Sequence, residues 1–323
     1  MAKILIIGGG GMVGQKFAAS LADTPLTGPS DQITLFDLGF PADGAAADHR
    51  ITGNLTDPFA VKKMVEDRPE VIFHLASIVS GEAESNFSLG WDVNGHAFWT
   101  FLAAVRAEHL DSDRTWRPRV VFTSSIAVFG SPYPDQISDE FLSAPQTSYG
   151  AQKAISELLL SDYSRKGFID GLSIRLPTIC VRPGKANLAA SSFFSGIIRE
   201  PLNGVEALLP VPTDVRHWHA SPRAAAGFLR HAGTLDLEKV APRRALNLPG
   251  VSCTVEEQIE ALRDIAGNDV VALIKPEPDE TIMRIVQGWP RDFAPKRAID
   301  LGFRAENDFH QIIQTYIDDD LPK

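Results

Sequence analysis

Short apolar segments that alternate with helical segments constrain the fold of this chain more than any other feature. The first, KILII at residues 3–7, is rich in β-branched residues and ends in glycines, after which a helical pattern begins. Similar apolar segments stand at 32–37, 71–76, 119–125 and 171–177. Strands that are apolar throughout are buried on both faces of a sheet. The sequence therefore predicts an α/β fold with a doubly wound parallel sheet.

Charge and cysteine content narrow the classes of partner. The net charge of −10 argues against nucleic acid or an anionic membrane as a partner. No stretch approaches a membrane span, and the first residues lack a signal-peptide pattern. Cys180 and Cys253 are far apart, which indicates a reducing compartment, so we expect a cytoplasmic protein. His217 and His219 lack the spacing of metal ligands, and we expect no metal site.

Three glycines mark the turn between the first strand and the first helix. Gly8, Gly11 and Gly14 follow the pattern G-x-x-G-x-x-G, which lets a pyrophosphate approach the backbone and the helix N-terminus. Asp37 follows Gly14 by 23 residues, at the end of the second strand. A carboxylate there binds ribose hydroxyls and repels a 2′-phosphate, which favours NAD over NADP. The structural alternatives are a turn without a ligand and a solvated acid.

A tyrosine and a lysine share one face of a later helix. Tyr149 and Lys153 are four residues apart at the start of a helical pattern. They lie about 25 residues beyond the strand-end hydroxyls Thr123, Ser124 and Ser125. A nearby ammonium lowers the pKa of a phenol, which makes a tyrosine a usable general base. In a doubly wound sheet the carboxyl ends of the strands line the ligand crevice. The pair therefore indicates proton transfer beside a nicotinamide, although the same spacing also occurs on helix surfaces by chance.

These motifs resemble the extended branch of the short-chain dehydrogenase/reductase superfamily, which also holds nucleotide-sugar epimerases and dehydratases. The resemblance rests on GGGGMVG, HLA, VVFTSSIAVFG, SYGAQKA and SIRLP, which cover about the first 180 residues in the family's order. It implies a Rossmann-type NAD-binding domain, which we place at 1–178. After about Pro177 the alternation weakens, so we expect a smaller substrate-binding lobe at 179–323, partly interleaved with the last elements of the sheet.

The resemblance also implies roles for single residues. Ser125 would hold the reacting oxygen while Tyr149 takes or gives its proton, and Lys153 would complete the catalytic set. Asn94 would support the site, with a packing amide as the alternative. The implied contacts of NAD are Gly8, Gly11, Met12, Val13, Gly14, Asp37, Asn54, Leu55, Leu75, Ala76, Thr123, Tyr149, Lys153, Pro177 and Ile179.

Two residues depart from the family pattern. Asn54 stands where the family usually has an aspartate that contacts adenine, which puts that contact in doubt. Phe129 replaces the common tyrosine of the AVYG motif, a harmless change if the ring only packs.

The candidate substrate contacts lie in three segments, around residues 78–84, 175–199 and 214–223. Arginine forks in the last two segments suit a carboxylate or phosphate, although a single arginine is more often a surface or structural residue than a ligand. The clustering of arginines predicts at least one clamp for an anionic group of the substrate, with Arg182 and Arg216 as the candidates. The predicted substrate residues are Ser80, Glu82, Ser125, Arg182, Asn187 and Arg216.

A closer resemblance, over nearly the whole length, is to the D-erythronate dehydrogenase group. It rests on SGEAE, SIAVFG, SYGAQKAISELLLSDYSRKGFIDG, RLPTICVRPGKANLAASSFFSGIIREPL and the late segment from WP to LGF. It implies oxidation of the C2 hydroxyl of D-erythronate, a small sugar acid, with NAD. The alternatives are a nucleotide-sugar epimerase or dehydratase, a dehydrogenase of another small hydroxy acid or alcohol, and a non-catalytic NAD-sensing protein.

The helix that carries the tyrosine and lysine also has apolar residues beyond the site. Ile155, Leu158 and Leu159 form an apolar stripe that fits either the core or a subunit interface. Related enzymes often pair through helices of this region, so the resemblance implies a homodimer.

Overall fold

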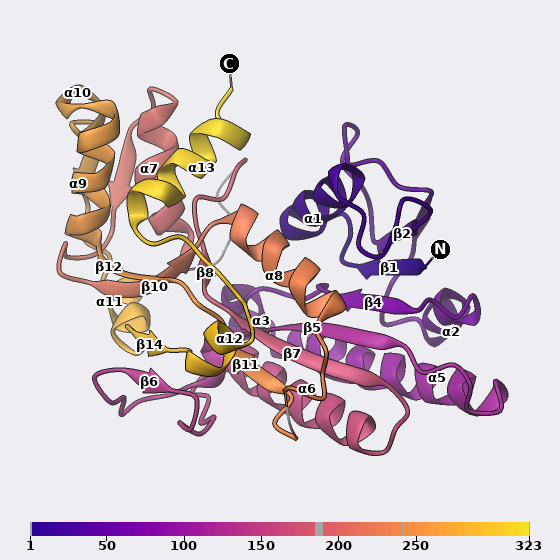
Figure 1. Cartoon of the computed structure of the whole chain (residues 1–323). Coiled ribbons are helices and arrows are strands. Elements are labelled where there is room, and N and C mark those ends of the chain that lie inside the picture. Colours follow the sequence, from indigo (N-terminus) through magenta and orange to yellow (C-terminus); the bar gives the residue numbers. More distant parts are fainter. Residues whose placement is uncertain (1, 185–189, 241, 323) are drawn as a thin grey trace.

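The computed structural model describes residues 2–184, 190–240 and 242–322. Within them, the central sheet has seven strands in the order β11-β7-β5-β4-β1-β2-β3, and every neighbouring pair is parallel (Figure 1). This confirms the predicted α/β fold with a Rossmann-type parallel sheet. The strands are β1 Lys3–Ile7, β2 Gln32–Asp37, β3 His49–Thr52, β4 Val71–His74, β5 Arg119–Ser125, β7 Asp170–Leu176 and β11 Ala245–Asn247.

Helices cover both faces of this sheet because its strands are apolar on both sides. On one face, α1 (Met12–Asp23) and α8 (Pro222–Thr234) bury the rings of Phe17 and Phe228. The opposite face carries α2 (Pro58–Glu66), α5 (Ala97–Asp111) and α6 (Ser148–Arg165), of which α5 and α6 lie in the lower part of Figure 1. Two separate apolar layers therefore hold the sheet between them, and the edge where the strands end stays free for a site.

Local interactions determine where α6 begins and how the chain runs between β4 and α5. Thr147 caps α6 by accepting a hydrogen bond from the Gly150 N–H at 3.1 Å, so Tyr149 lies in the first turn. Between β4 and α5 the chain forms α3 (Ser80–Ser85), α4 (Phe87–Gly90) and a π-helix, Trp91–His96. Single π-turns inside helices often occur at functional sites, because they displace one side chain from the regular pattern.

A second lobe has a core of its own. Its sheet, β12-β10-β8, is packed against helices α7, α9 and α13 around buried residues such as Phe194 and Ile312. After residue 179 the chain returns to the central sheet, since α8 covers that sheet and β11 forms its edge. The elements of the lobe are β8 Thr178–Ile179, α7 Ser192–Leu202, β9 Ala207–Leu209, β10 Arg216–Ala220, β12 Val251–Thr254, α9 Val255–Ala266, α10 Asn268–Val271, β13 Ile274–Pro276, α11 Glu280–Gln287 and α13 Phe309–Asp319.

Three short elements connect the two parts. Strands β6 (Ile137–Ser138) and β14 (Phe293–Ala294) pair in parallel, and α12 (Lys296–Asp300) follows them. A 3₁₀ turn, Ile126–Val128, directly follows β5.

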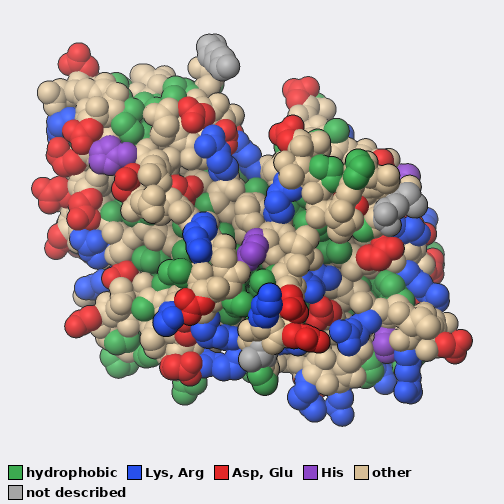
Figure 2. Space-filling model, viewed as in Figure 1, with side chains coloured by type: hydrophobic (Ala, Val, Ile, Leu, Met, Phe, Trp, Pro, Cys, Tyr) green, Lys and Arg blue, Asp and Glu red, His purple; other side chains and the backbone are tan. Residues whose placement is uncertain are grey.

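The surface carries charge of both signs. On the face shown in Figure 2, acidic and basic side chains are interspersed. In the part of the chain that the structure describes, no helix is long and apolar enough to cross a membrane. The same residues contain no group of three or more histidine, cysteine or acidic side chains that could hold a metal ion. Cys180 and Cys253 are both free and buried.

Candidate active site

A cavity of about 680 Å³ lies at the edge where β1, β4, β5 and β7 end and α1 begins. This is the edge at which a doubly wound sheet binds its ligands. Residues from both lobes line the cavity, so the chain brings together segments that are far apart in sequence. The predicted residues that line it are Gly8, Gly11, Met12, Val13, Gly14, Leu75, Ser80, Thr123, Ser125, Tyr149, Lys153, Pro177, Ile179 and Arg182.

The glycine turn forms one end of the cavity, and it tolerates no side chain at Gly8 or Gly14. Gly8 has φ +86°, and a Cβ atom there would lie 2.5 Å from the backbone nitrogen of Ala76. A Cβ on Gly14 would lie 2.3 Å from the carbonyl oxygen of Gly8. Gly11 caps α1 without a side-chain hydrogen bond, so the first N–H groups of the helix keep their capacity to donate. The turn therefore fits a pyrophosphate.

Asp37 lies beside this turn at the end of β2. Its Oδ2 accepts a hydrogen bond from Gly10 N at 2.8 Å, and its Oδ1 accepts one from Leu38 N at 2.7 Å. A carboxylate oxygen has two lone pairs, so each oxygen can accept a further bond from a ribose hydroxyl. Together with the glycine turn, this donor and acceptor set fits a dinucleotide without a 2′-phosphate.

Four of the predicted cofactor residues do not line the cavity: Asp37, Asn54, Leu55 and Ala76. Asn54 Oδ1 accepts a hydrogen bond from Thr56 N at 3.0 Å, so the amide shapes the loop after β3. Leu55 is buried in the apolar layer under α2. Ala76 packs against Gly8, where its backbone leaves no room for a side chain.

Lys153 is buried at the centre of the site. Its Nζ donates a hydrogen bond to the carbonyl oxygen of Thr123 at 2.9 Å and lies 5.5 Å from the centre of the Tyr149 ring. Burial lowers the pKa of Lys153 to about 7, while the carboxylate of Glu157 opposes that shift. The ammonium is therefore held in place by the backbone of β5 and is easily deprotonated.

Two serines and an arginine influence the hydroxyl of Tyr149. Burial raises the pKa of its hydroxyl, whereas hydrogen bonding to the side chains of Ser77 and Ser125 and the charge of Arg182 lower that pKa. The sequence predicted Lys153 as the charge acting on Tyr149, and that role stays a prediction. The structure adds Arg182 as a second charge that lowers the pKa of this tyrosine.

Asn94 does not line the cavity, and it holds the segment after β4 instead. The π-helix directs its buried amide to Ile78, where Oδ1 accepts from N at 2.8 Å and Nδ2 donates to O at 3.1 Å. Oδ1 also accepts from Ser77 Oγ at 3.0 Å, and Nδ2 donates to Gln152 Oε1 at 2.7 Å. All four hydrogen-bonding positions of the amide are used, so Asn94 fixes the backbone that carries Ser77.

The structure separates the two candidate arginines. Arg182 lines the cavity, where its backbone N–H and its Nη2 donate to Ser195 and Ser191 at 3.0 and 2.9 Å. Arg216 does not line the cavity, because it forms an ion pair of 3.1 Å with Glu257 at the edge of β10. Its Nη1 also donates to the Ser252 carbonyl at 3.1 Å.

Of the remaining predicted substrate residues, some line the cavity and others do not. Ser80 lines the cavity at the start of α3, whereas Glu82, two residues later, does not. The acid of α3 that does line it is Glu84, which also accepts a hydrogen bond from Ser148 N at 2.9 Å. Asn187 lies outside the described residues.

Several residues that line the cavity were not predicted: Ser77, Glu84, Tyr133, His217, Arg284 and Trp289. His217 bonds to Thr178 Oγ1 at 2.7 Å and to the Pro290 carbonyl at 3.0 Å, and burial lowers its pKa to about 4. It is therefore neutral at physiological pH and structural in its contacts. Arg284 is an exposed residue of α11. Its position in the sequence pattern of that helix is the same as that of an arginine in solvent, so the sequence did not indicate its place in the cavity.

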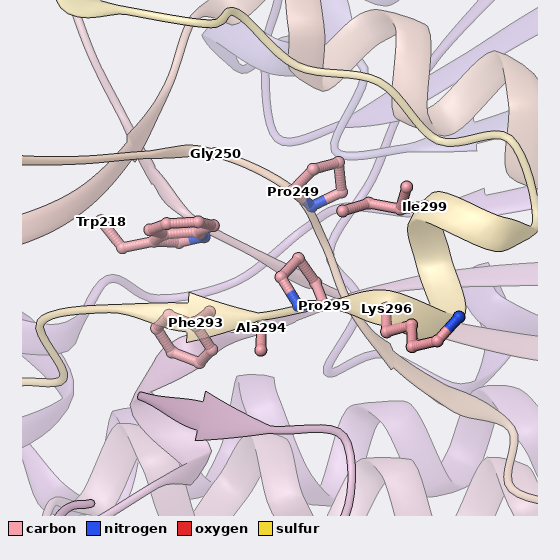
Figure 3. Close-up of a pocket in the computed structure, with 8 residues that line it drawn as sticks. All are labelled: Trp218, Pro249, Gly250, Phe293, Ala294, Pro295, Lys296 and Ile299. Atoms are coloured by element: carbon pink, nitrogen blue, oxygen red, sulfur yellow. The ribbon is translucent and has the colours of Figure 1, made fainter. Parts of the chain in front are cut away.

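A second, smaller cavity of about 330 Å³ lies between β10, β14 and α12 (Figure 3). The rings of Trp218 and Phe293 lie together there, with their centres 5.4 Å apart. Its one charged side chain, Lys296, pairs with Asp300 at 2.5 Å. The described residues that line this cavity offer no carboxylate, imidazole or hydroxyl, so we place the chemistry in the larger one.

Comparison with known proteins agrees with this geometry. The model of the NAD dependent epimerase/dehydratase family matches residues 4–221. The chain is 43% identical to a D-erythronate dehydrogenase of Cupriavidus necator, over 98% of each chain. It is 38% identical to a D-erythronate dehydrogenase of Haemophilus influenzae, over 99% of this chain and 100% of that one.

A solved structure is similar over the same length. The crystal structure of a nucleoside-diphosphate-sugar epimerase from Agrobacterium tumefaciens superposes with a TM-score of 0.94 at 55% identity, and the match covers 99% of this chain and 94% of that one. The family model and the curated relatives confirm the resemblance read from the glycine, serine and tyrosine motifs. This chain therefore belongs to the NAD-dependent epimerase/dehydratase family.

Proposed function

We propose that this protein is an NAD-dependent dehydrogenase that oxidises the C2 hydroxyl of a small sugar acid, most simply D-erythronate. The observation that carries the proposal is the position of Arg182. It places a guanidinium in the cavity that also holds the glycine turn, Ser125 and Tyr149. A guanidinium fork binds a carboxylate through paired hydrogen bonds, so it would orient the acid beside the tyrosine. The names of the relatives from C. necator and H. influenzae support the same substrate.

Each residue then has a defined part. The glycine turn and the first N–H groups of α1 bind the pyrophosphate of the cofactor, and Asp37 binds the adenosine ribose. NAD, when bound, supplies the hydride acceptor. Ser125, whose Oγ accepts from Ala127 N at 3.1 Å, holds the oxygen of the reacting hydroxyl. Tyr149 takes the proton from that oxygen, and Lys153 binds the nicotinamide ribose.

The size of the cavity supports a small substrate. A cavity of about 680 Å³ is of the size that holds one drug-sized ligand. A cavity of this size can admit the nicotinamide half of a dinucleotide together with a four-carbon acid.

The second candidate is a nucleotide-sugar epimerase or dehydratase, which the name of the A. tumefaciens structure favours. The same serine and tyrosine begin both reactions by removing a hydride from a secondary alcohol. The two functions differ in the fate of that hydride. The test incubates the protein with NAD⁺ and either C4 to C6 sugar acids or nucleotide sugars, following both NADH and products. Net NADH with D-erythronate supports the dehydrogenase, whereas conversion of a nucleotide sugar without net NADH overturns it.

Replacing Arg182 by leucine is expected to raise KM for the sugar acid by about 10- to 100-fold and to change KM for NAD by less than about twofold. A charge-assisted hydrogen bond contributes about 1.5–3 kcal/mol, which sets this range. Steady-state kinetics with each substrate varied in turn measures both values. Arg263→Leu, on the exposed face of α9, is the matched control. An unchanged KM for the acid in the Arg182 variant would remove the carboxylate clamp.

We also propose that two copies pair through α5 and α6. These helices pack side by side, and Trp99 and Leu158 are exposed on them by 58% and 72%. Large exposed apolar groups on one surface mark interaction sites. Leu158→Glu is therefore expected to shift the protein to a monomer in light scattering, while Leu142→Glu, in an exposed loop, leaves the oligomer unchanged. A wild-type monomer would contradict the proposal.

A further inference from the structure

The segment that follows β4 brings an unassigned hydroxyl to the reacting tyrosine. Ser77 lines the cavity with Tyr149, and hydrogen bonding from its side chain lowers the pKa of the tyrosine hydroxyl. In the structure its Oγ donates to the Ile78 carbonyl and to Asn94 Oδ1. Ser125 approaches the same tyrosine from β5. The tyrosine hydroxyl therefore has two serine neighbours, and only Ser125 has a role in the reaction as described so far.

The Ser77 hydroxyl has two acceptors within hydrogen-bond distance. Its Oγ lies 3.0 Å from Asn94 Oδ1 and 3.1 Å from the Ile78 carbonyl oxygen, and a hydroxyl has one proton for the two acceptors. Each acceptor also has a second donor, since Asn94 Oδ1 accepts from Ile78 N and the Ile78 carbonyl accepts from Asn94 Nδ2. Ser77 can therefore turn away without leaving a buried acceptor unpaired.

We propose that Ser77 is a positioning residue of the tyrosine base, whose hydroxyl turns from Asn94 and Ile78 to donate to the Tyr149 oxygen when that oxygen is negatively charged. A phenolate accepts hydrogen bonds only, whereas the neutral phenol also donates one, so the donor matters most in the charged form. The inference rests on the proposed function, because it assigns Ser77 to the same proton-transfer step. No covalent bond of Ser77 changes during that step.

Gln152 holds this arrangement from α6. It is fully buried, and its Oε1 accepts the hydrogen bond of Asn94 Nδ2 at 2.7 Å. Its Nε2 has no hydrogen-bond partner among the described residues, so only the oxygen of the amide takes part in this network. Gly90 makes room for it, because a Cβ at that position would lie 2.8 Å from Nε2. The residue before the lysine of the motif thus sets the position of Ser77 through Asn94.

The expected signature is a change in pH dependence. Loss of the Ser77 donor destabilises the phenolate, so the pKa of Tyr149 rises, by about one unit for one hydrogen bond. Oxidation needs the phenolate, so the acid limb of kcat/KM moves to higher pH by the same amount. The charged and titratable groups that line the cavity with Tyr149 stay in place: Lys153, Arg182, Glu84, Tyr133, His217 and Arg284.

The first experiment compares pH profiles of kcat/KM for the wild type, Ser77→Ala and Ser77→Thr. The alanine variant is expected to lose about tenfold on the acid limb and to regain the wild-type plateau at high pH, and threonine is expected to restore the profile. Ser85→Ala, an exposed serine of the neighbouring α3, is the control. An unshifted limb, or an equal loss at every pH, would overturn the proposal, because a merely structural role lowers activity uniformly.

A second experiment needs no substrate. The absorbance of tyrosinate is followed against pH in the wild type and in Ser77→Ala. The curve of the same protein with Tyr149→Phe is subtracted from each, which isolates one of the four tyrosines. The pKa of Tyr149 is expected to be about one unit higher without Ser77. A higher pKa in a protein that does not oxidise sugar acids would leave the Ser77 inference standing and refute the proposed function. Equal titrations would refute the inference alone.

Discussion

Replacing Tyr149 by phenylalanine is expected to lower kcat by about 10²- to 10⁴-fold, the range that general acid–base catalysis contributes. The variant keeps the ring that packs beside Lys153 and loses only the hydroxyl that takes the proton. Binding of NAD is expected to stay within about twofold, because the glycine turn and Asp37 are unchanged. Steady-state assays give kcat. Quenching of the intrinsic protein fluorescence by NADH gives the dissociation constant of the cofactor.

Tyr163→Phe is the matched control for this substitution. Tyr163 lies on the same helix, α6, and packs against Phe168 on the sheet side, outside the cavity lining. It is expected to keep the wild-type kcat. A Tyr149→Phe variant that retained most of its activity would contradict the assignment of the base.

Replacing Arg175 by methionine is expected to lower the free energy of unfolding by about 3–5 kcal/mol. Arg175 forms a buried ion pair with Glu157, in which Nε and Nη2 donate to the two carboxylate oxygens at 2.9 and 2.7 Å. Nη1 also donates to Asn247 Oδ1 at 3.1 Å, which ties β7 to β11. Removing the arginine leaves a buried carboxylate without its partner. Urea unfolding followed by circular dichroism measures the loss.

The double variant Glu157→Met, Arg175→Met separates charge from packing. Replacing both partners of a buried pair by apolar groups is often neutral, so most of the lost stability is expected to return. If the single variant unfolded at the wild-type urea concentration, the pair would not stabilise the fold. Since the Glu157 carboxylate also raises the pKa of Lys153, the double variant, which lacks that carboxylate, is expected to carry a lysine that loses its charge at lower pH.

The parts of the site that sit on regular elements were predictable from sequence. The apolar strands, the glycine turn and the spacing of Tyr149 and Lys153 on one helix each have a fixed geometry, so local pattern sufficed to place them. The resemblance added Ser125 and Asn94, and the structure gives Asn94 contacts that no periodicity indicates. Its four hydrogen bonds depend on a π-turn, which displaces one side chain without leaving a signature in the sequence.

The substrate end was less predictable, because it depends on how the second lobe meets the first. Arg182 and Arg216 look alike in sequence, yet Glu257 pairs with one and the cavity receives the other. Glu82 and Glu84 are two positions apart on α3, and the orientation of that short helix decides which one lines the cavity. Such choices follow from tertiary contacts that a single sequence does not contain.

The most direct test of the proposed reaction uses D-erythronate that carries deuterium at C2, with NAD⁺ and the purified protein. The account predicts that the deuterium appears in the reduced nicotinamide, that the rate falls when the label is present, and that a 2-oxo acid accumulates. Reduced cofactor without deuterium would place the oxidation at another carbon. No reduced cofactor, with a nucleotide sugar converted in parallel, would contradict the dehydrogenase and favour an epimerase or dehydratase.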